Sequence, residues 1–136
     1  MEAVKEIISL SLEALEEESA EKASQIEPLE EVIDDLDKVL KKRHVKRLRK
    51  GKCSMDMGFI LSDICTNLER VADHCSNIGV SLMQEDEDEV SPHGYLENFR
   101  DAENEMFRKK YEAYTMKYKL PEKEKNVEKE EEPVLN

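Results

Sequence analysis

The sequence predicts an all-α fold, an up-and-down bundle of three helices followed by one further C-terminal helix. Two observations support this prediction. Apolar residues recur at intervals of three and four along most of the chain, which is the period of an amphipathic helix. Glycine and proline number only 4 each, so the many turns that an all-β chain needs are missing. A length of 136 residues suggests one domain with a modest core.

Changes in composition divide the chain into four parts. Residues 1–84 are predicted to form the three-helix bundle, residues 85–94 an acidic loop and residues 95–119 the last helix. Residues 120–136 are rich in charge and poor in apolar side chains, which is typical of a disordered tail. The first helix is predicted to turn one apolar stripe toward its partners: Val4, Ile8, Leu12 and Leu15.

The second and third helices are defined by similar stripes. The second is predicted to begin near Ser19 and to bend at Pro28. It ends in the basic run 41–52. These positive charges are favourable at the negative C-terminal end of a helix dipole. Alternatively, they contact anionic lipid or an acidic partner. The third helix is predicted from Ser54 to about Gln84, with this apolar stripe: Ile60, Ile64, Leu68, Val71, Cys75, Ile78 and Leu82.

The net charge and the cysteines narrow the class of protein. A net charge of -12 would repel phosphates, so nucleic acid is not expected as a partner, and cations are the favoured ligand class. Three cysteines without a CxxC pattern favour a reduced, cytoplasmic compartment. Acidic residues begin at position 2, unlike a signal peptide, and no stretch approaches the roughly 20 apolar residues of a transmembrane helix.

Two pairs of acidic residues stand four positions apart, Glu30 with Asp34 and Glu69 with Asp73. Residues at this spacing share one side of a helix, with Cβ atoms about 5–6 Å apart. If the second and third helices pack side by side, the two pairs meet at one edge of the bundle. A multivalent cation would relieve the repulsion among four carboxylates, and iron, zinc or manganese accepts such ligands. Since the chain holds 33 acids, a solvated face without metal is the simpler alternative.

The segment 26–83, above all LEEVIDDL and LSDICTNLERVADHCSNI, resembles the PhoU domain, a family that regulates bacterial phosphate uptake. It is most similar to the PhoU-like C-terminal region of bacterial sodium/phosphate cotransporter family proteins. The resemblance implies that the family's E-x-x-x-D motif, which binds metal ions in some members, falls on the two acidic pairs. It also implies a regulatory role, with a phosphate transporter or a membrane-bound sodium/phosphate cotransporter as the partner. A typical member has two bundles in tandem and this chain has one, so it is a transporter tail, a fragment or half of a homodimer.

The remaining polar residues and cysteines are expected at the periphery of the metal site, on the surface or in the core. Three are weaker candidates for the periphery of the metal site: Glu27, Asp63 and Asn77. His74 lies about 100° from Asp73 around the helix, which makes shared coordination awkward and favours a polar surface contact. Cys65 and Cys75 fall near the apolar side and are predicted to be small core residues.

The sequence offers no nucleophile–base pair and no Gly-rich phosphate loop, so an enzyme is not expected. Two alternatives to a metal-binding regulator stay open. One is a metal-free helical adaptor, and the less favoured one is an enzyme that uses a carboxylate-bound metal.

Overall fold

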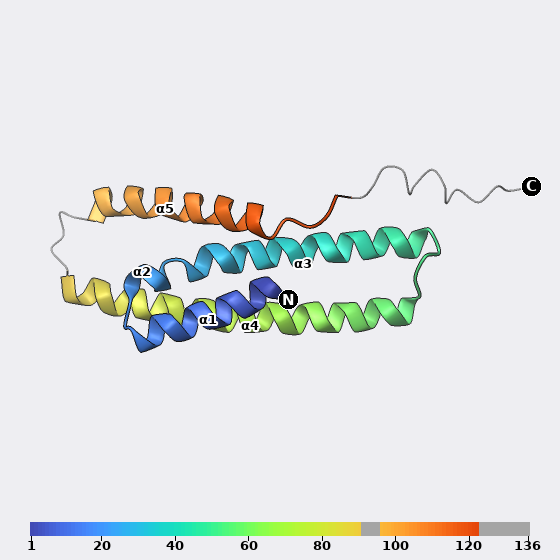
Figure 1. Cartoon of the computed structure of the whole chain (residues 1–136), viewed down its shortest axis with the longest axis horizontal. Helices are drawn as coiled ribbons and strands as arrows, with labels where there is room; N and C mark the ends of the chain where they lie inside the picture. The colour runs from blue at the N-terminus through green and yellow to red at the C-terminus, as the bar shows by residue number, and fades with distance from the viewer. Residues whose placement is uncertain (91–95, 123–136) are drawn as a thin grey trace, which may run out of the picture.

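The computed structural model describes the backbone of residues 1–90 and 96–122 and the side chains of residues 1–85 and 104–122. The helices, in chain order, are α1 (Glu2–Glu16), α2 (Ala20–Ala23), α3 (Ile26–Arg49), α4 (Met55–Val90) and α5 (Leu96–Lys117). The four long helices run alternately in opposite directions (Figure 1). The predicted all-α, up-and-down bundle is confirmed.

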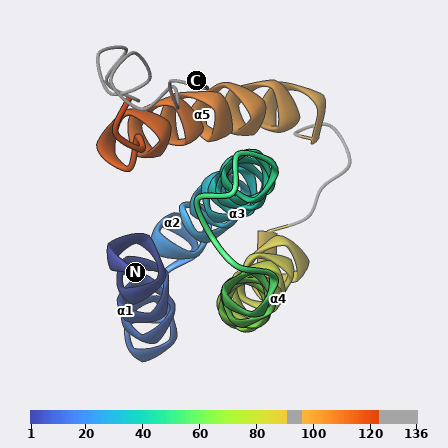
Figure 2. The same cartoon turned by 90° about the vertical axis from the view of Figure 1, so that its right-hand side faces the viewer.

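Three of the long helices, α1, α3 and α4, pack around a shared core, and α5 lies on the outer side of α3 (Figure 2). Side chains of the C-terminal half of α5 attach it to the bundle. The Tyr111 hydroxyl donates to Asp35 Oδ2 at 2.5 Å, and Lys117 Nζ lies 2.7 Å from Glu6 Oε1. The Tyr114 ring packs against the core.

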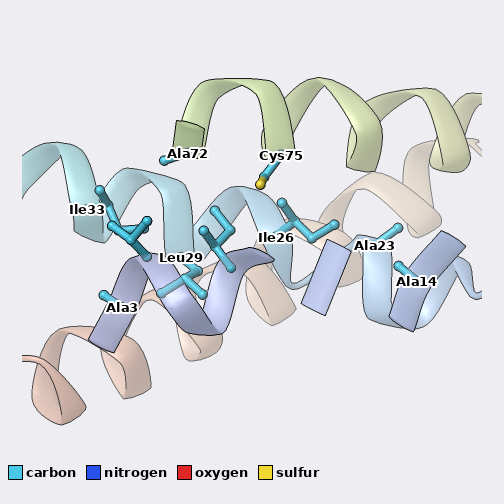
Figure 3. Packing of buried hydrophobic residues seen from close by; sticks show 10 residues of the cluster. Ala3, Ala14, Ala23, Ile26, Leu29, Ile33, Ala72 and Cys75 are labelled. Atoms are coloured by element: carbon cyan, nitrogen blue, oxygen red, sulfur yellow. The ribbon is translucent and has the colours of Figure 1, made fainter. Parts of the chain in front are cut away.

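The core lies where α1, α2, α3 and α4 meet (Figure 3). Ile7, Ile26 and Leu29 are fully buried at its centre. Burying a side chain of this size contributes about 1.5–3 kcal/mol relative to leaving it in water. Small residues from α1, α2 and α4 complete the cluster and allow the helices to approach closely: Ala3, Ala14, Ala23, Ala72 and Cys75.

The predicted apolar stripes of α1 and α4 were partly wrong. On α1, Ile8 is 40 % exposed and Leu12 56 % exposed, and on α4, Ile60 and Ile64 are about half exposed. The buried face of α1 is rotated toward the following side chains: Ala3, Val4, Ile7, Ser11 and Ala14. Each helix has apolar residues over a wider arc than its neighbours can cover, and α1 turns its smaller side chains inward. An apolar surface is therefore left on α1 and α4.

The break after α1 occurs where the sequence predicts it. Glu18 has a φ of 48°, a left-handed conformation that ends the helix, and the hydroxyl of Ser19 then accepts the Lys22 N–H at the start of α2. Lys22 Nζ bridges back to Glu13 and Glu17, at 3.2 and 2.8 Å. These contacts fix the reversal of the chain between α1 and α3.

The structure differs from the prediction at two other places, before Pro28 and at residues 85–90. Pro28 does not bend a continuous helix: α2 ends at Ala23, and Pro28 lies in the first turn of α3. A proline there removes no intrahelical hydrogen bond. The acidic residues 85–90, predicted as a loop, continue α4 to Val90, because glutamate favours helix and the next breaker is Pro92.

Residues 91–94 of the predicted loop and residues 123–136 of the predicted tail lie outside the described residues. None of the helices in the described part of the chain is long and apolar enough to span a bilayer.

Candidate metal centre

The four predicted carboxylates lie along one edge of the α3–α4 pair. Glu30 and Asp34 come from α3, and Glu69 and Asp73 come from the antiparallel α4. The pKa of Glu30 is raised, first by burial and then by the negative charges of Asp34 and Asp73. Asp73 therefore acts on Glu30 across the helix interface. The helix packing brings the two pairs to one edge, as their spacing suggests.

Two lysines of α3 interrupt this acidic edge. Lys38 Nζ lies 2.8 Å from Asp34 Oδ2, and this hydrogen bond is the main reason that the pKa of Lys38 is raised. Glu69, on α4, adds its negative charge to the surroundings of both Lys38 and Lys41. Positive lysine side chains therefore lie among the carboxylates of this edge and relieve part of the repulsion between them.

The donor chemistry of the edge fits a hard cation, since carboxylate oxygens are the preferred ligands of such ions. The geometry is less complete. No group of three or more His, Cys, Asp or Glu side chains comes close enough to hold an ion anywhere in the described residues. An ion shared by Glu30, Asp34, Glu69 and Asp73 requires new side-chain rotamers and the release of Lys38 from Asp34.

Asp37 shares the side of α3 that carries Glu30 and Asp34, but the sequence pattern does not predict its burial. It is 8 % exposed, and its Oδ2 pairs with Lys41 Nζ at 2.8 Å. Its other oxygen, Oδ1, is buried without a hydrogen-bond partner in the structure. The sequence feature that points to Asp37 is the spacing of the acids at positions 30, 34 and 37, which share one side of α3.

A recess of about 120 Å³ lies beside Asp37 and is lined mainly by apolar side chains. Cys65 and Glu69 of α4 also line it. Burial raises the pKa of the Cys65 thiol, and the neighbouring Asp37 carboxylate raises it further. The recess is large enough for water, which is the simplest partner for the buried carboxylate oxygen.

The weaker candidates are dispersed. Glu27 is close enough for its charge to raise the pKa of Glu30, whereas Asp63 is an exposed residue of α4. His74 and Asn77 line a shallow groove with Leu15 of α1. His74 thus has the polar surface setting that its position on the helix favours.

The cysteines behave largely as predicted. Cys65 and Cys75 are buried core residues, 5 % and 7 % exposed. Cys53 is half-buried in the turn between α3 and α4, with its sulfur 3.6 Å from His44 Nδ1.

Comparison with known proteins identifies the family. Residues 1–82 match the PhoU domain, so the match covers more than half of the chain and all of α1, α2 and α3. The chain belongs to the PhoU domain family. Both acidic pairs lie inside the matched region. The match to the PhoU domain agrees with the prediction that the chain is not an enzyme.

One curated PhoU relative is the phosphate-specific transport system accessory protein PhoU homolog 1 of Thermotoga maritima. It is 29% identical over 72 residues, which are 53% of this chain and 31% of the relative. This PhoU-domain chain therefore spans about a third of the length of that relative. No solved structure matches the chain.

Proposed function

We propose that this chain is a regulatory unit of phosphate transport that acts in the cytoplasm on a phosphate transporter. The match of residues 1–82 to the PhoU domain is the observation that carries the proposal. The relative from Thermotoga maritima is named as an accessory protein of a phosphate-specific transport system, which supports a transporter as the partner. The stretch LSDICTNLERVADHCSNI favours a membrane-bound sodium/phosphate cotransporter among such partners.

The partner can be tested by co-purification with each class of transporter from cells that express both. We expect retention of this chain by a phosphate transporter and none by an unrelated transporter of similar size. Equal retention by both would contradict the proposal.

We propose that two copies of the chain associate as a homodimer. The exposed apolar side chains of Ile8, Leu12, Ile60 and Ile64 support this, because burying them would favour association. Analytical ultracentrifugation should give a dimer mass that falls in an Ile60→Ser/Ile64→Ser variant. A monomer mass for the unaltered chain at high concentration would contradict the homodimer.

We also propose that Glu30, Asp34, Glu69 and Asp73 hold a metal ion, with iron, zinc and manganese as the candidates. The raised pKa of Glu30 supports this, because it reflects burial and mutual repulsion that a cation would relieve. A bound ion would neutralise the edge and link α3 to α4. The four side chains would act as ligands, and Lys38 would move away from Asp34.

Elemental analysis of the purified protein tests the metal proposal. Near-stoichiometric metal should be present in the native protein and absent from Glu69→Ala/Asp73→Ala, with helicity by circular dichroism unchanged. Glu105→Ala/Glu112→Ala is the matched control, because it removes two exposed acids from one face of α5. Equal metal content in both variants would rule out the assignment.

A metal-free helical adaptor is the second candidate. The ion pairs of Lys38 with Asp34 and of Lys41 with Asp37 favour it, since they neutralise part of the edge without an ion. Transporter binding that persists in the presence of a chelator would support the adaptor. Binding that is lost on chelation and restored by one metal would support the metal-binding regulator.

A further inference from the structure

The far end of the α3–α4 hairpin has a charge opposite to that of the whole chain. We call residues 41–59 the hairpin tip; they comprise the end of α3, the turn and the start of α4. Residues 41–52 include eight Lys and Arg, and no acidic residue lies between Asp37 and Asp56. The chain as a whole carries a net charge of -12. Positive charge is therefore concentrated at one end of the bundle.

The tip projects beyond the rest of the bundle. In Figure 1, α3 and α4 extend together past the start of α1 and past the end of α5. Lys42, Lys46 and Arg49 are exposed there, and the described residues provide no carboxylate within ion-pair distance of them. They are spaced at three and four along α3 and so share its outer side. These cations are free to meet a ligand.

Large apolar side chains are exposed on the same hairpin tip. Val45 is 44 % exposed on α3, and on α4 Met55 is 64 % and Phe59 65 % exposed. Met55 and Phe59 stand four residues apart and lie on one side of the first turns of α4. Cations beside exposed aromatic and aliphatic groups are the combination that binds the interface of an anionic bilayer.

We propose that the hairpin tip docks on an anionic lipid surface, with the α3 cations at the headgroups and Phe59 and Met55 in the interfacial layer. The proposal goes beyond the proposed regulatory function and is independent of the metal edge. The cations match the anionic headgroups, and the exposed apolar side chains match the interfacial layer of a bilayer. An acidic protein surface with apolar side chains is the competing partner, and binding to pure lipid vesicles separates the two.

The negative charge of the rest of the molecule does not prevent this docking. Asp37 pairs with Lys41 at the inner end of the tip. Arg49, near the outer end, is twelve residues from Asp37, which is about 18 Å along the helix. That distance is about twice the screening length of roughly 8 Å at physiological salt, so the outer end of the tip keeps its positive charge. Asp56 is the one acid within the tip. An end-on approach presents the tip and leaves the acidic edge far from the membrane.

Co-sedimentation of the full chain with vesicles tests the proposal. Vesicles of equal parts phosphatidylglycerol and phosphatidylcholine should bind the protein at low salt, and pure phosphatidylcholine should not. Lys42→Gln/Lys46→Gln/Arg49→Gln should weaken binding roughly 100-fold, since each cation near the surface contributes about fivefold. The matched control, Lys5→Gln/Arg108→Gln/Lys109→Gln, removes the same charge from exposed sites outside the tip and should bind within a few fold of the native protein.

A fluorescent reporter tests the apolar part of the proposal. The chain has no tryptophan, so Phe59→Trp provides a single probe at the exposed ring. Its emission should shift to the blue with anionic vesicles and stay unchanged with phosphatidylcholine alone. Absence of binding to anionic vesicles at low salt, or equal loss of binding in both triple variants, would overturn the proposal. So would a change in self-association without vesicle binding, which would indicate an acidic surface of a second copy as the true partner.

Discussion

Replacing the buried Asp37 with leucine should make the protein more stable. Asp37 Oδ1 is buried without a partner, and such a group costs about 1–3 kcal/mol. A leucine there would extend toward the recess lined by Ile33, Leu36 and Leu40, and burial of its side chain contributes up to about 1.5–3 kcal/mol. The lost ion pair with Lys41 offsets up to about 1 kcal/mol, because Lys41 is partly exposed and returns to water. We expect a net gain of about 2 kcal/mol.

Urea unfolding followed by circular dichroism measures this difference in the free energy of unfolding. Lys41→Ala is the informative companion, because it leaves the Asp37 carboxylate unpaired and should reduce stability. A loss of 1 kcal/mol or more in Asp37→Leu would refute the reasoning and show that Asp37 is well satisfied, for instance by water in the recess. A gain in stability together with weaker transporter binding would mean that Asp37 is kept for function at the expense of stability.

Three further substitutions test the core and the acidic edge. Ile26→Ala should cost about 2–5 kcal/mol of unfolding free energy, because Ile26 is fully buried, whereas a cost below about 1 kcal/mol would show that the core can collapse around it. Gly79→Leu should cost about 1–3 kcal/mol or more, because a Cβ on Gly79 would lie 3.2 Å from the Ala23 carbonyl oxygen, and a thermal melt equal to the native one would contradict that contact. Glu30→Gln should raise the free energy of unfolding at pH 7. The pKa of Glu30 is raised in the folded protein, so its ionised carboxylate opposes folding at any pH above that pKa. The native protein recovers this stability as the pH falls through the folded pKa, so the gain should vanish near pH 4, and a gain that persists there would point to a cause other than charge.

The sequence was most informative about the helices and their order. The period of the apolar residues located α3 and α4, and the four-residue spacing placed Glu30 with Asp34 on one side of α3 and Glu69 with Asp73 on one side of α4. These features depend on local geometry, which a single helix imposes on its own residues. The predicted start of the second helix near Ser19 also agrees with the break at Glu18.

The sequence was less informative about which side of each helix is covered. Leu12 and Ile60 belong to apolar arcs wider than their neighbours can bury, and only the packing decides which part of the arc is buried. The ion pair of Lys38 with Asp34 and the burial of Asp37 also depend on the neighbouring helix. The spacing of acidic residues along one helix predicts only a shared side. It contains no information on the distance to side chains of the neighbouring helix.

The connection between α3 and α4 has a consequence for the order of folding. These helices are consecutive in the chain and joined by a short turn, so their contacts close small loops and are expected to form early. By contrast, the ties of α5 through Tyr111 to Asp35 and through Lys117 to Glu6 link residues 76 and 111 positions apart. We therefore expect α5 to dock last and to open most readily. In native-state hydrogen exchange, amides of α5 should lose protection well before those of α3, whereas equal protection would mean that the bundle and α5 unfold as one unit.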